Sequence, residues 1–141
     1  MENHSKEELV AILAHEVGHY KKKHVRNNLI ISIIQTGILL FIFGQLADST
    51  RLAAMLGAQE PSFHIALLGF TLLFNPISLV LGILMNLYSR KNEFEADAYA
   101  KETFDGGALI NALKRLSVDS LSNLYPHPWY VFFHYSHPPL L

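Results

Sequence analysis

Cysteine is absent from this sequence of 141 residues, and charged residues are scarce. Without cysteine, disulfide bridges and thiolate metal sites are excluded, so a metal would have to be held by histidine, aspartate or glutamate. Only 16% of the residues are charged, where soluble domains carry roughly 25%, and the formal net charge is −1. Nothing in this charge balance points to nucleic acid, and we expect no nucleic-acid partner.

The scarcity of charge is concentrated in two long apolar stretches. Residues 27–47 form a stretch of 21 residues without a charge, and residues 61–89 form another of 29. A helix that crosses a bilayer needs about 20 predominantly apolar residues, so both stretches are long enough. A helix buried in a large soluble core is the alternative, but few charged residues remain to cover such a core. We predict membrane-spanning helices at 27–47 and 63–88, joined by a loop at 48–62.

Basic residues predict how the two spans are oriented. Four of them lie in 21–26, just before the first span, and two lie at 90–91, just after the second, whereas the connecting loop has only Arg51. Cytoplasmic flanks of membrane helices carry the excess of lysine and arginine. We therefore expect residues 1–26 and 89–141 in the cytosol and the loop on the far side of the membrane.

The segment before the first span is predicted to be an amphipathic helix. Ser5 and Glu8 fit the capping-box pattern, and the helix is expected to run from Lys6 to about His24. Apolar residues recur along it at spacings of three and four, which predicts one buried face. This face would consist of Leu9, Ile12, Leu13, Val17 and Tyr20.

A metal-binding pattern lies on this helix, in His15-Glu-Val-Gly-His19. Positions four apart return to nearly the same face of a helix, so the two imidazoles can hold one zinc ion. Glu16 is then well placed to take a proton from water, and Gly18 allows another helix or a substrate strand to approach. Two surface histidines beside a salt-bridging glutamate are the alternative reading of such a pattern.

The segment Glu93-Phe-Glu-Ala-Asp97 is the best source of a third ligand. A hydrolytic zinc site needs three protein ligands and an open fourth position. Glu93 and Asp97 share a helix face, so Glu93 can ligate zinc while Asp97 accepts the ring N–H of a ligating histidine, whereas Glu95 points elsewhere. An ordinary amphipathic helix with a solvated acidic face is the alternative.

The spans and the motifs together predict the fold class. Two spans return the chain to the side it left, which brings residues 15–19 and 93–97 to the same face of the membrane. We predict an all-α integral membrane protein in which metalloprotease helices flank a two-span hairpin, with residues 1–141 belonging to one peptidase domain. A new helix is expected from about Arg90, another at 108–116, and no regular structure is assigned from Tyr125 onwards.

Three motifs in order resemble those of the eukaryotic CAAX prenyl proteases of the a-factor-converting type. They are His15-Glu-Val-Gly-His19, the segment 89–100 after the hairpin, and His134-Tyr-Ser-His-Pro-Pro139. The resemblance covers nearly the whole chain. The bacterial HtpX-type membrane proteases share the first two motifs, whereas the tail looks more like the eukaryotic branch.

The resemblance implies a zinc metalloendopeptidase that removes the last three residues of proteins ending in a prenylated cysteine. It assigns the zinc ligands to His15, His19 and Glu93, the acid–base role to Glu16, and a supporting carboxylate to Asp97. It also implies prenylated CAAX proteins and the lipid bilayer as partners. The expected location is the endoplasmic reticulum membrane and inner nuclear membrane, with the active site facing the cytosol or nucleoplasm.

The histidine-rich tail contributes one further candidate. The resemblance places His137 near the substrate, where it would hold the peptide or stabilise the tetrahedral oxyanion. A loop histidine braced by Pro138 is the alternative. His134 is a weaker candidate, and the remaining histidines are read as non-catalytic: His4, His24, His64 and His127.

Full-length relatives have more membrane helices before the zinc motif and an arginine after the tail, so this chain is expected to be a partial member. Three other functions remain open. The chain could be an HtpX-like membrane quality-control protease, an inactive relative that only binds zinc, or a membrane anchor with accidental motifs.

Overall fold

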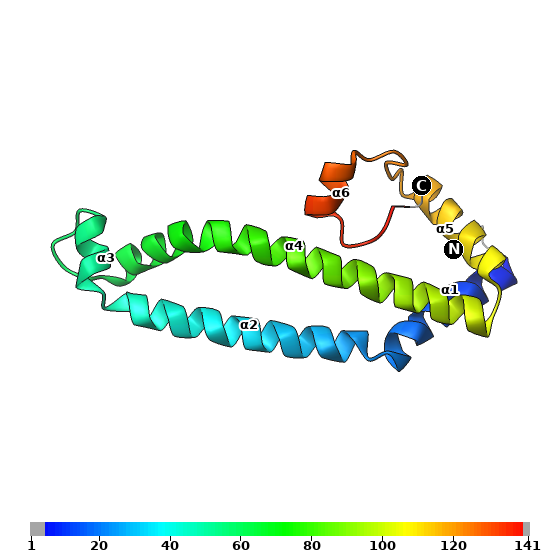
Figure 1. Cartoon of the computed structure of the whole chain (residues 1–141), viewed down its shortest axis with the longest axis horizontal. Coiled ribbons are helices and arrows are strands. Elements are labelled where there is room, and N and C mark those ends of the chain that lie inside the picture. The colour runs from blue at the N-terminus through cyan, green and yellow to red at the C-terminus, as the bar shows by residue number, and fades with distance from the viewer. Residues whose placement is uncertain (1–4, 140–141) are drawn as a thin grey trace. The chain divides into compact units, whose positions relative to one another are not determined.

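The computed structural model describes residues 5–139, and these residues form six α-helices and no strand (Figure 1). His4 lies outside the described residues. The chain divides into two compact units, an apolar unit at 26–81 and a second unit built from the segments on either side of it. The all-α prediction is confirmed. The helices are α1 (Lys6–Lys21), α2 (His24–Ala47), α3 (Thr50–Met55), α4 (Phe63–Thr103), α5 (Gly106–Asp119) and α6 (Pro128–His134).

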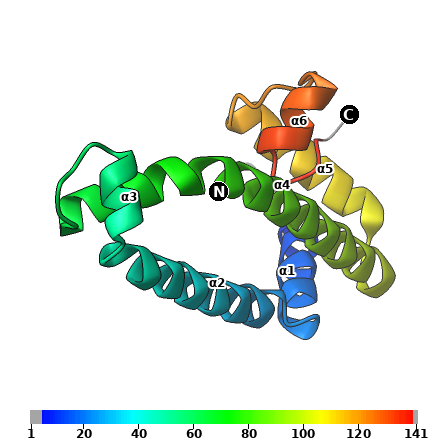
Figure 2. The same ribbon diagram turned by 60° about the vertical axis from the view of Figure 1, so that its left-hand side comes forward.

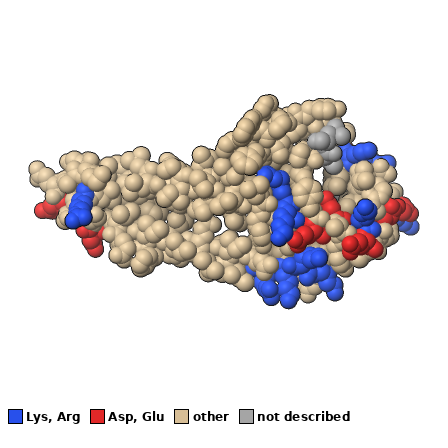
Figure 3. All heavy atoms as spheres, in the orientation of Figure 1, with Lys and Arg blue, Asp and Glu red and all other residues tan. Residues whose placement is uncertain are grey.

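The two predicted spans lie in α2 and the first half of α4. Within the described chain, these are the two helices long and apolar enough to cross a membrane, and their most apolar windows are 0% and 6% buried. Ile33 and Leu73, for example, are 62% and 55% exposed. On the face that Figure 3 shows, charged side chains are absent from the middle of both helices and reappear around α3. This surface does not belong to a soluble core and suits contact with lipid.

The connection between the spans contains the short helix α3, which the sequence analysis treated as loop. Ser49 caps this helix, and its Oγ accepts a hydrogen bond of 3.2 Å from the Leu52 N–H. Leu52 lies against Gly69 of α4, where an added Cβ would be 2.7 Å from the leucine Cδ1. The serine cap and this close packing explain why the segment becomes helical.

The second span and the expected helix from Arg90 are one continuous helix, so the prediction of a separate helix is wrong. α4 extends over 41 residues and continues through Pro76. Residues 83–103 contain neither glycine nor proline, so nothing in this part of the sequence interrupts the helix. Glu93 and Asp97 are consequently carried on a direct continuation of the second span.

Small residues bring α1 close to α4. Ala11, Ala96 and Ala100 are 0%, 0% and 1% exposed. A Cβ added to Gly18 would lie 3.1 Å from the Cα and the carbonyl oxygen of Ala96. The close helix approach predicted at Gly18 is therefore present, and Figure 2 shows α4 passing in front of α1; α1 also packs along α5.

The buried face predicted for α1 is wrong. Leu9, Leu13 and Tyr20 are 42%, 61% and 79% exposed, and Ile12 and Val17 are only partly buried. The residues that pack are the small ones, because alanine and glycine let two helix backbones approach where larger side chains would hold them apart.

Glu8 fixes the beginning of α1 in two ways. In the predicted capping box, the Ser5 Oγ accepts the Glu8 N–H at 3.2 Å, and the Ser5 N–H donates to Glu8 Oε2 at 3.0 Å. Glu8 is 5% exposed, and its Oε1 lies 3.3 Å from Arg115 Nε of α5. The capping residue Glu8 therefore also links α1 to α5. Together these contacts fix the direction of the helix that carries the metal-binding pattern.

Replacing Gly18 with alanine is expected to destabilise the chain by about 1–3 kcal/mol, because the new Cβ must push the backbones of α1 and α4 apart. Thermal unfolding in detergent, followed by circular dichroism, measures the change. Gly37→Ala is the matched control, since a Cβ at Gly37 meets nothing within 4 Å and alanine favours a helix. Equal unfolding temperatures for the two variants would contradict the tight contact at Gly18.

Candidate active site

Three polar side chains from α1 and α4 converge on one point. The Nε2 atoms of His15 and His19 are 3.1 Å apart. Glu93 Oε2 lies 3.5 Å from His15 Nε2, and Glu93 Oε1 lies 3.7 Å from His19 Nε2. One atom from each residue can be chosen so that all lie within 4.8 Å of one another. The structure thus brings together the three residues that the sequence predicts as metal ligands.

The spacing of these atoms fits a tetrahedral metal ion. Ligand atoms bound about 2.0–2.1 Å from a tetrahedral zinc ion lie roughly 3.3 Å from each other. The separations of 3.1, 3.5 and 3.7 Å in the cluster are close to this value. The three side chains are 15%, 18% and 16% exposed, so a carboxylate and two ring nitrogens share a space with little solvent. A cation satisfies this set of donors.

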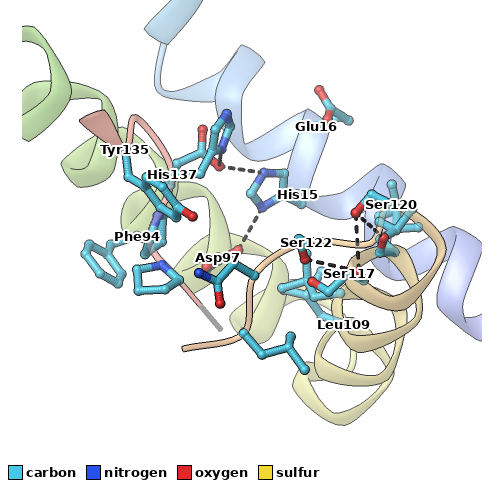
Figure 4. Close-up of a pocket in the computed structure, with 18 residues that line it drawn as sticks. His15, Glu16, Phe94, Asp97, Leu109, Ser117, Ser120, Ser122, Tyr135 and His137 are labelled. Carbon is cyan, nitrogen blue, oxygen red and sulfur yellow. Dashed lines mark hydrogen bonds and ion pairs between the residues drawn. The ribbon is translucent and has the colours of Figure 1, made fainter. Parts of the chain in front are cut away.

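Asp97 contacts a candidate ligating histidine, as the sequence predicts, and the structure shows that this histidine is His15. His15 Nδ1 lies 2.8 Å from Asp97 Oδ1 (Figure 4). A carboxylate can only accept here, so Nδ1 carries the proton and Nε2 presents its lone pair to the cluster. The hydrogen bond to Asp97 raises the pKa of His15, whereas burial lowers the pKa of His19. Protons therefore compete with a metal mainly at His15.

Glu16 borders the cavity that opens beside the cluster. This cavity has a volume of about 710 Å³, and His15, Glu16 and Glu93 lie along its wall. Glu16 itself is exposed. Much of the remaining wall is apolar and comes from α1, α4 and α5: Ile12, Phe94, Leu109, Leu113 and Leu116. A carboxylate, a candidate metal centre and an apolar surface therefore meet in one space.

His137 reaches the cluster from the C-terminal tail. Its Nδ1 lies 3.2 Å from Glu93 Oε2, and 72% of its side chain is exposed. His137 also borders the cavity, beside Asp97 and Tyr135 (Figure 4). His134 lies elsewhere, at the end of α6, where its ring is 4.7 Å from that of Tyr130. Of the two histidines in the motif His134–Pro139, the structure brings only His137 to the cluster.

The tail contains the helix α6, for which the sequence analysis assigned no structure. His127 caps it by accepting the Trp129 N–H, and Pro128 occupies the first turn, where a missing N–H costs nothing. The histidine cap and the following proline were the available signal. Arg90 of α4 then donates hydrogen bonds to two backbone carbonyls, that of Val131 within α6 and that of its C-cap residue Tyr135.

Replacing Arg90 with alanine is expected to loosen the tail and leave the three-residue cluster intact. Hydrogen bonds from a charged group contribute about 1.5–3 kcal/mol, which corresponds to roughly tenfold to hundredfold faster local opening. Hydrogen–deuterium exchange of residues 131–139, measured by mass spectrometry, tests this. Arg51→Ala removes the same charge at α3 and serves as the control. Unchanged exchange in the Arg90 variant would show that the arginine does not hold the tail.

Two residues that the sequence analysis set aside also lie near the cluster. His24, read as non-catalytic, has its Nδ1 3.0 Å from His19 Nδ1. Glu95, expected to point elsewhere, has its Oε2 3.1 Å from His24 Nε2. No spacing rule indicates these contacts, because they depend on how the chain turns between α1 and α2.

Comparisons with known proteins agree with this arrangement. The family model described as Peptidase family M48 matches residues 1–141. A CAAX prenyl protease 1 homolog of Taenia solium is 41% identical over 140 residues, which are 96% of this chain and 29% of that protein. The Homo sapiens homolog is 36% identical over 137 residues, with the same two coverages of 96% and 29%.

A solved structure is also similar. The crystal structure of S. mikatae Ste24p gives a TM-score of 0.85 at 30% identity, covering 99% of this chain and 36% of that chain. The chain therefore spans about a third of the length of these relatives, 29% of the two sequences and 36% of the solved chain.

Proposed function

Since this chain belongs to peptidase family M48, we propose that it acts as a zinc metalloendopeptidase that removes the C-terminal tripeptide from prenylated CAAX proteins. The observation that carries the proposal is the convergence of His15, His19 and Glu93 beside a cavity that Glu16 also borders. The names of the relatives, CAAX prenyl protease 1 homologs, support this substrate class.

Each residue of the cluster has a proposed role. His15, His19 and Glu93 would hold the zinc ion, and Asp97 would keep His15 in the tautomer that offers Nε2. When bound, the ion would supply Lewis-acid polarisation of a carbonyl group and make a water molecule easier to deprotonate.

The proton steps are assigned to Glu16. Its carboxylate would accept a proton from the attacking water and then deliver it to the leaving amine of the cleaved peptide. A general base needs direct or single-water contact with the proton that it takes, and the position of Glu16 on the cavity wall supports this assignment.

The proposed substrate position is the cavity. Its apolar wall, which includes Leu109, Leu113 and Leu116, suits the aliphatic residues near the end of a CAAX sequence. His137 lies within 3.2 Å of Glu93 and is 72% exposed, so its ring can reach both the cluster and a bound peptide. We assign it to holding the peptide or stabilising the oxyanion of the tetrahedral intermediate.

The proposed location is the endoplasmic reticulum membrane and the inner nuclear membrane. Among residues 5–139, two helices are long and apolar enough to cross a bilayer. The basic residues at 21–26 and 90–91 support a cytosolic or nucleoplasmic position for the cluster, with α3 on the far side. A prenylated substrate would reach this side of the membrane by inserting its lipid in the bilayer.

The test of function is cleavage of a farnesylated CAAX peptide by the detergent-purified chain loaded with zinc. We expect release of the C-terminal tripeptide, detected by mass spectrometry, and much slower cleavage of the same peptide without the prenyl group. Equal cleavage of both peptides would favour a quality-control protease. Stoichiometric zinc without cleavage of either would favour a relative that only binds metal, and an absence of zinc would contradict the proposal.

A further inference from the structure

We infer that His24 and Glu95 position His19 in the metal site, as a chain of three side chains that ends at the candidate metal. His24 contacts the ring of His19 on the side away from the metal position, and Glu95 contacts the ring of His24. This inference rests on the proposed metal centre and adds two residues that direct one of its ligands.

The contacts form a continuous path. His19 Nδ1 lies 3.0 Å from His24 Nδ1, and His24 Nε2 lies 3.1 Å from Glu95 Oε2. The rings of His19 and His24 meet edge to face, with centroids 5.0 Å apart. The path begins on α1, passes through the first residue of α2 and ends on α4, so three helices meet behind one ligand.

With a neutral His24 ring, one placement of protons satisfies every contact of this path. Glu95 accepts, so the Nε2 of His24 carries the proton that it donates. In the neutral ring, the Nδ1 of His24 is then an acceptor, and it must receive the Nδ1–H of His19. This leaves a lone pair on His19 Nε2, the atom 3.1 Å from His15 Nε2 and 3.7 Å from Glu93 Oε1. The path therefore selects the tautomer of His19 that a metal ligand needs.

The break between α1 and α2 makes this contact possible. Residues five apart on an uninterrupted helix point about 140° away from each other, so His24 could not reach the ring of His19. α1 instead ends at Lys21, and Lys23 adopts a φ of 60°. A left-handed residue turns the chain sharply, and α2 begins at His24 with its ring directed back to His19.

Each of the two candidate metal ligands His15 and His19 thus has its own supporting carboxylate. Asp97 fixes His15 directly, and Glu95 fixes His19 through His24. An ordinary buried histidine would also satisfy its ring nitrogens, and His24 is only 3% exposed. His24 differs because one of its two partners, His19, is a candidate metal ligand. His24 contacts the Nδ1 of His19, which is the nitrogen that faces away from the metal position.

The experiment measures zinc affinity in the detergent-purified chain by competition with a chromophoric chelator. His24→Leu removes both ring nitrogens, and we expect the affinity to fall tenfold to a hundredfold. His24→Asn retains an acceptor near the position of Nδ1, and we expect it to recover a large part of that loss. Glu95→Gln keeps an acceptor for His24 Nε2, so its loss should be smaller than that of Glu95→Ala. His64→Leu is the matched control on an exposed histidine and should bind zinc like the unaltered chain.

Cobalt substitution gives a measurement that would stay unchanged if His24 only stabilised the fold. We expect the visible bands of bound Co²⁺ to shift in His24→Leu and to return towards those of the unaltered chain in His24→Asn. Unfolding temperatures from circular dichroism identify variants that have lost the fold. If His24→Leu does not fold, the zinc affinities and cobalt bands of His24→Asn and Glu95→Ala are compared with those of the unaltered chain to test the inference.

Three results would overturn the inference. Zinc affinity and cobalt bands of the His24 and Glu95 variants could match those of the unaltered chain, or His24→Asn could bind no better than His24→Leu. Either result would leave the proposed metal centre standing. Zinc that fails to bind the unaltered chain would refute the metal centre itself, and with it the positioning of its ligand.

Discussion

Glu16→Gln is expected to lower the rate of peptide cleavage by roughly 10²- to 10⁴-fold while zinc stays bound. Glutamine has the shape of glutamate but cannot accept a proton at neutral pH, so the attacking water and the leaving amine lose their proton carrier. Glu16 is exposed, and it is not among the residues that converge as metal ligands. The loss should therefore appear in kcat with little change in metal content.

The control for this prediction is Glu7→Gln, an exposed glutamate in the first turn of the same helix. It changes the net charge by the same amount and lies far along α1 from the cluster, so its kcat should match that of the unaltered chain. Zinc content is measured by elemental analysis of the same preparations. Cleavage by Glu16→Gln within a few-fold of the unaltered chain would exclude Glu16 as the general base.

The core of the candidate site could be predicted because it depends on helical periodicity and on the number of spans. His15 and His19 are one turn apart on one helix, as are Glu93 and Asp97 on another, and a two-span hairpin returns the chain to one side. These rules need no knowledge of the turns between the elements. The reasoning predicts that Asp97 contacts a ligating histidine, and the structure identifies this histidine as His15, with Nδ1 2.8 Å from Asp97 Oδ1.

The supporting residues of the site could not be predicted in the same way. His24 reaches His19 only because Lys23 adopts a left-handed conformation. Lysine rarely adopts this conformation, so nothing in the amino-acid sequence indicates the turn. His137 was identified by resemblance, and its position depends on α6 and on the hydrogen bonds from Arg90, which join segments about 40 residues apart in sequence.

The errors about burial in α1 have a common cause. Hydrophobic periodicity identifies an apolar face, but it assumes that this face is the one packed inside the chain. Here Leu13 and Tyr20 are exposed, and Ala11 and Gly18 make the close contacts. Periodicity does not tell which residues let two helices approach most closely, and in α1 these are the small ones, alanine and glycine, because they hold the backbones apart least.

Removing a ligand is expected to have the largest effect on the metal. His15→Ala, His19→Ala and Glu93→Ala should each reduce zinc affinity by more than roughly 100-fold, beyond the range found for supporting residues. Each variant leaves two of the three donors that lie within 4.8 Å of one another in the unaltered chain. Two donors do not complete a site with one open position. Elemental analysis after gel filtration should find about one zinc per unaltered chain and almost none in the variants.

His64→Ala and Glu60→Ala are the matched controls, because they remove the same two side-chain types at exposed positions in the apolar unit. Both should retain zinc at the level of the unaltered chain. Retention of zinc by Glu93→Ala alone would mean that another carboxylate completes the site, and Asp97 would be the first to test because it already contacts His15. Retention by both histidine variants would contradict the metal centre. Loss of zinc in all three ligand variants, with the controls intact, would establish that α4, in its continuation beyond the second span, supplies the third ligand to a pattern that precedes the first span.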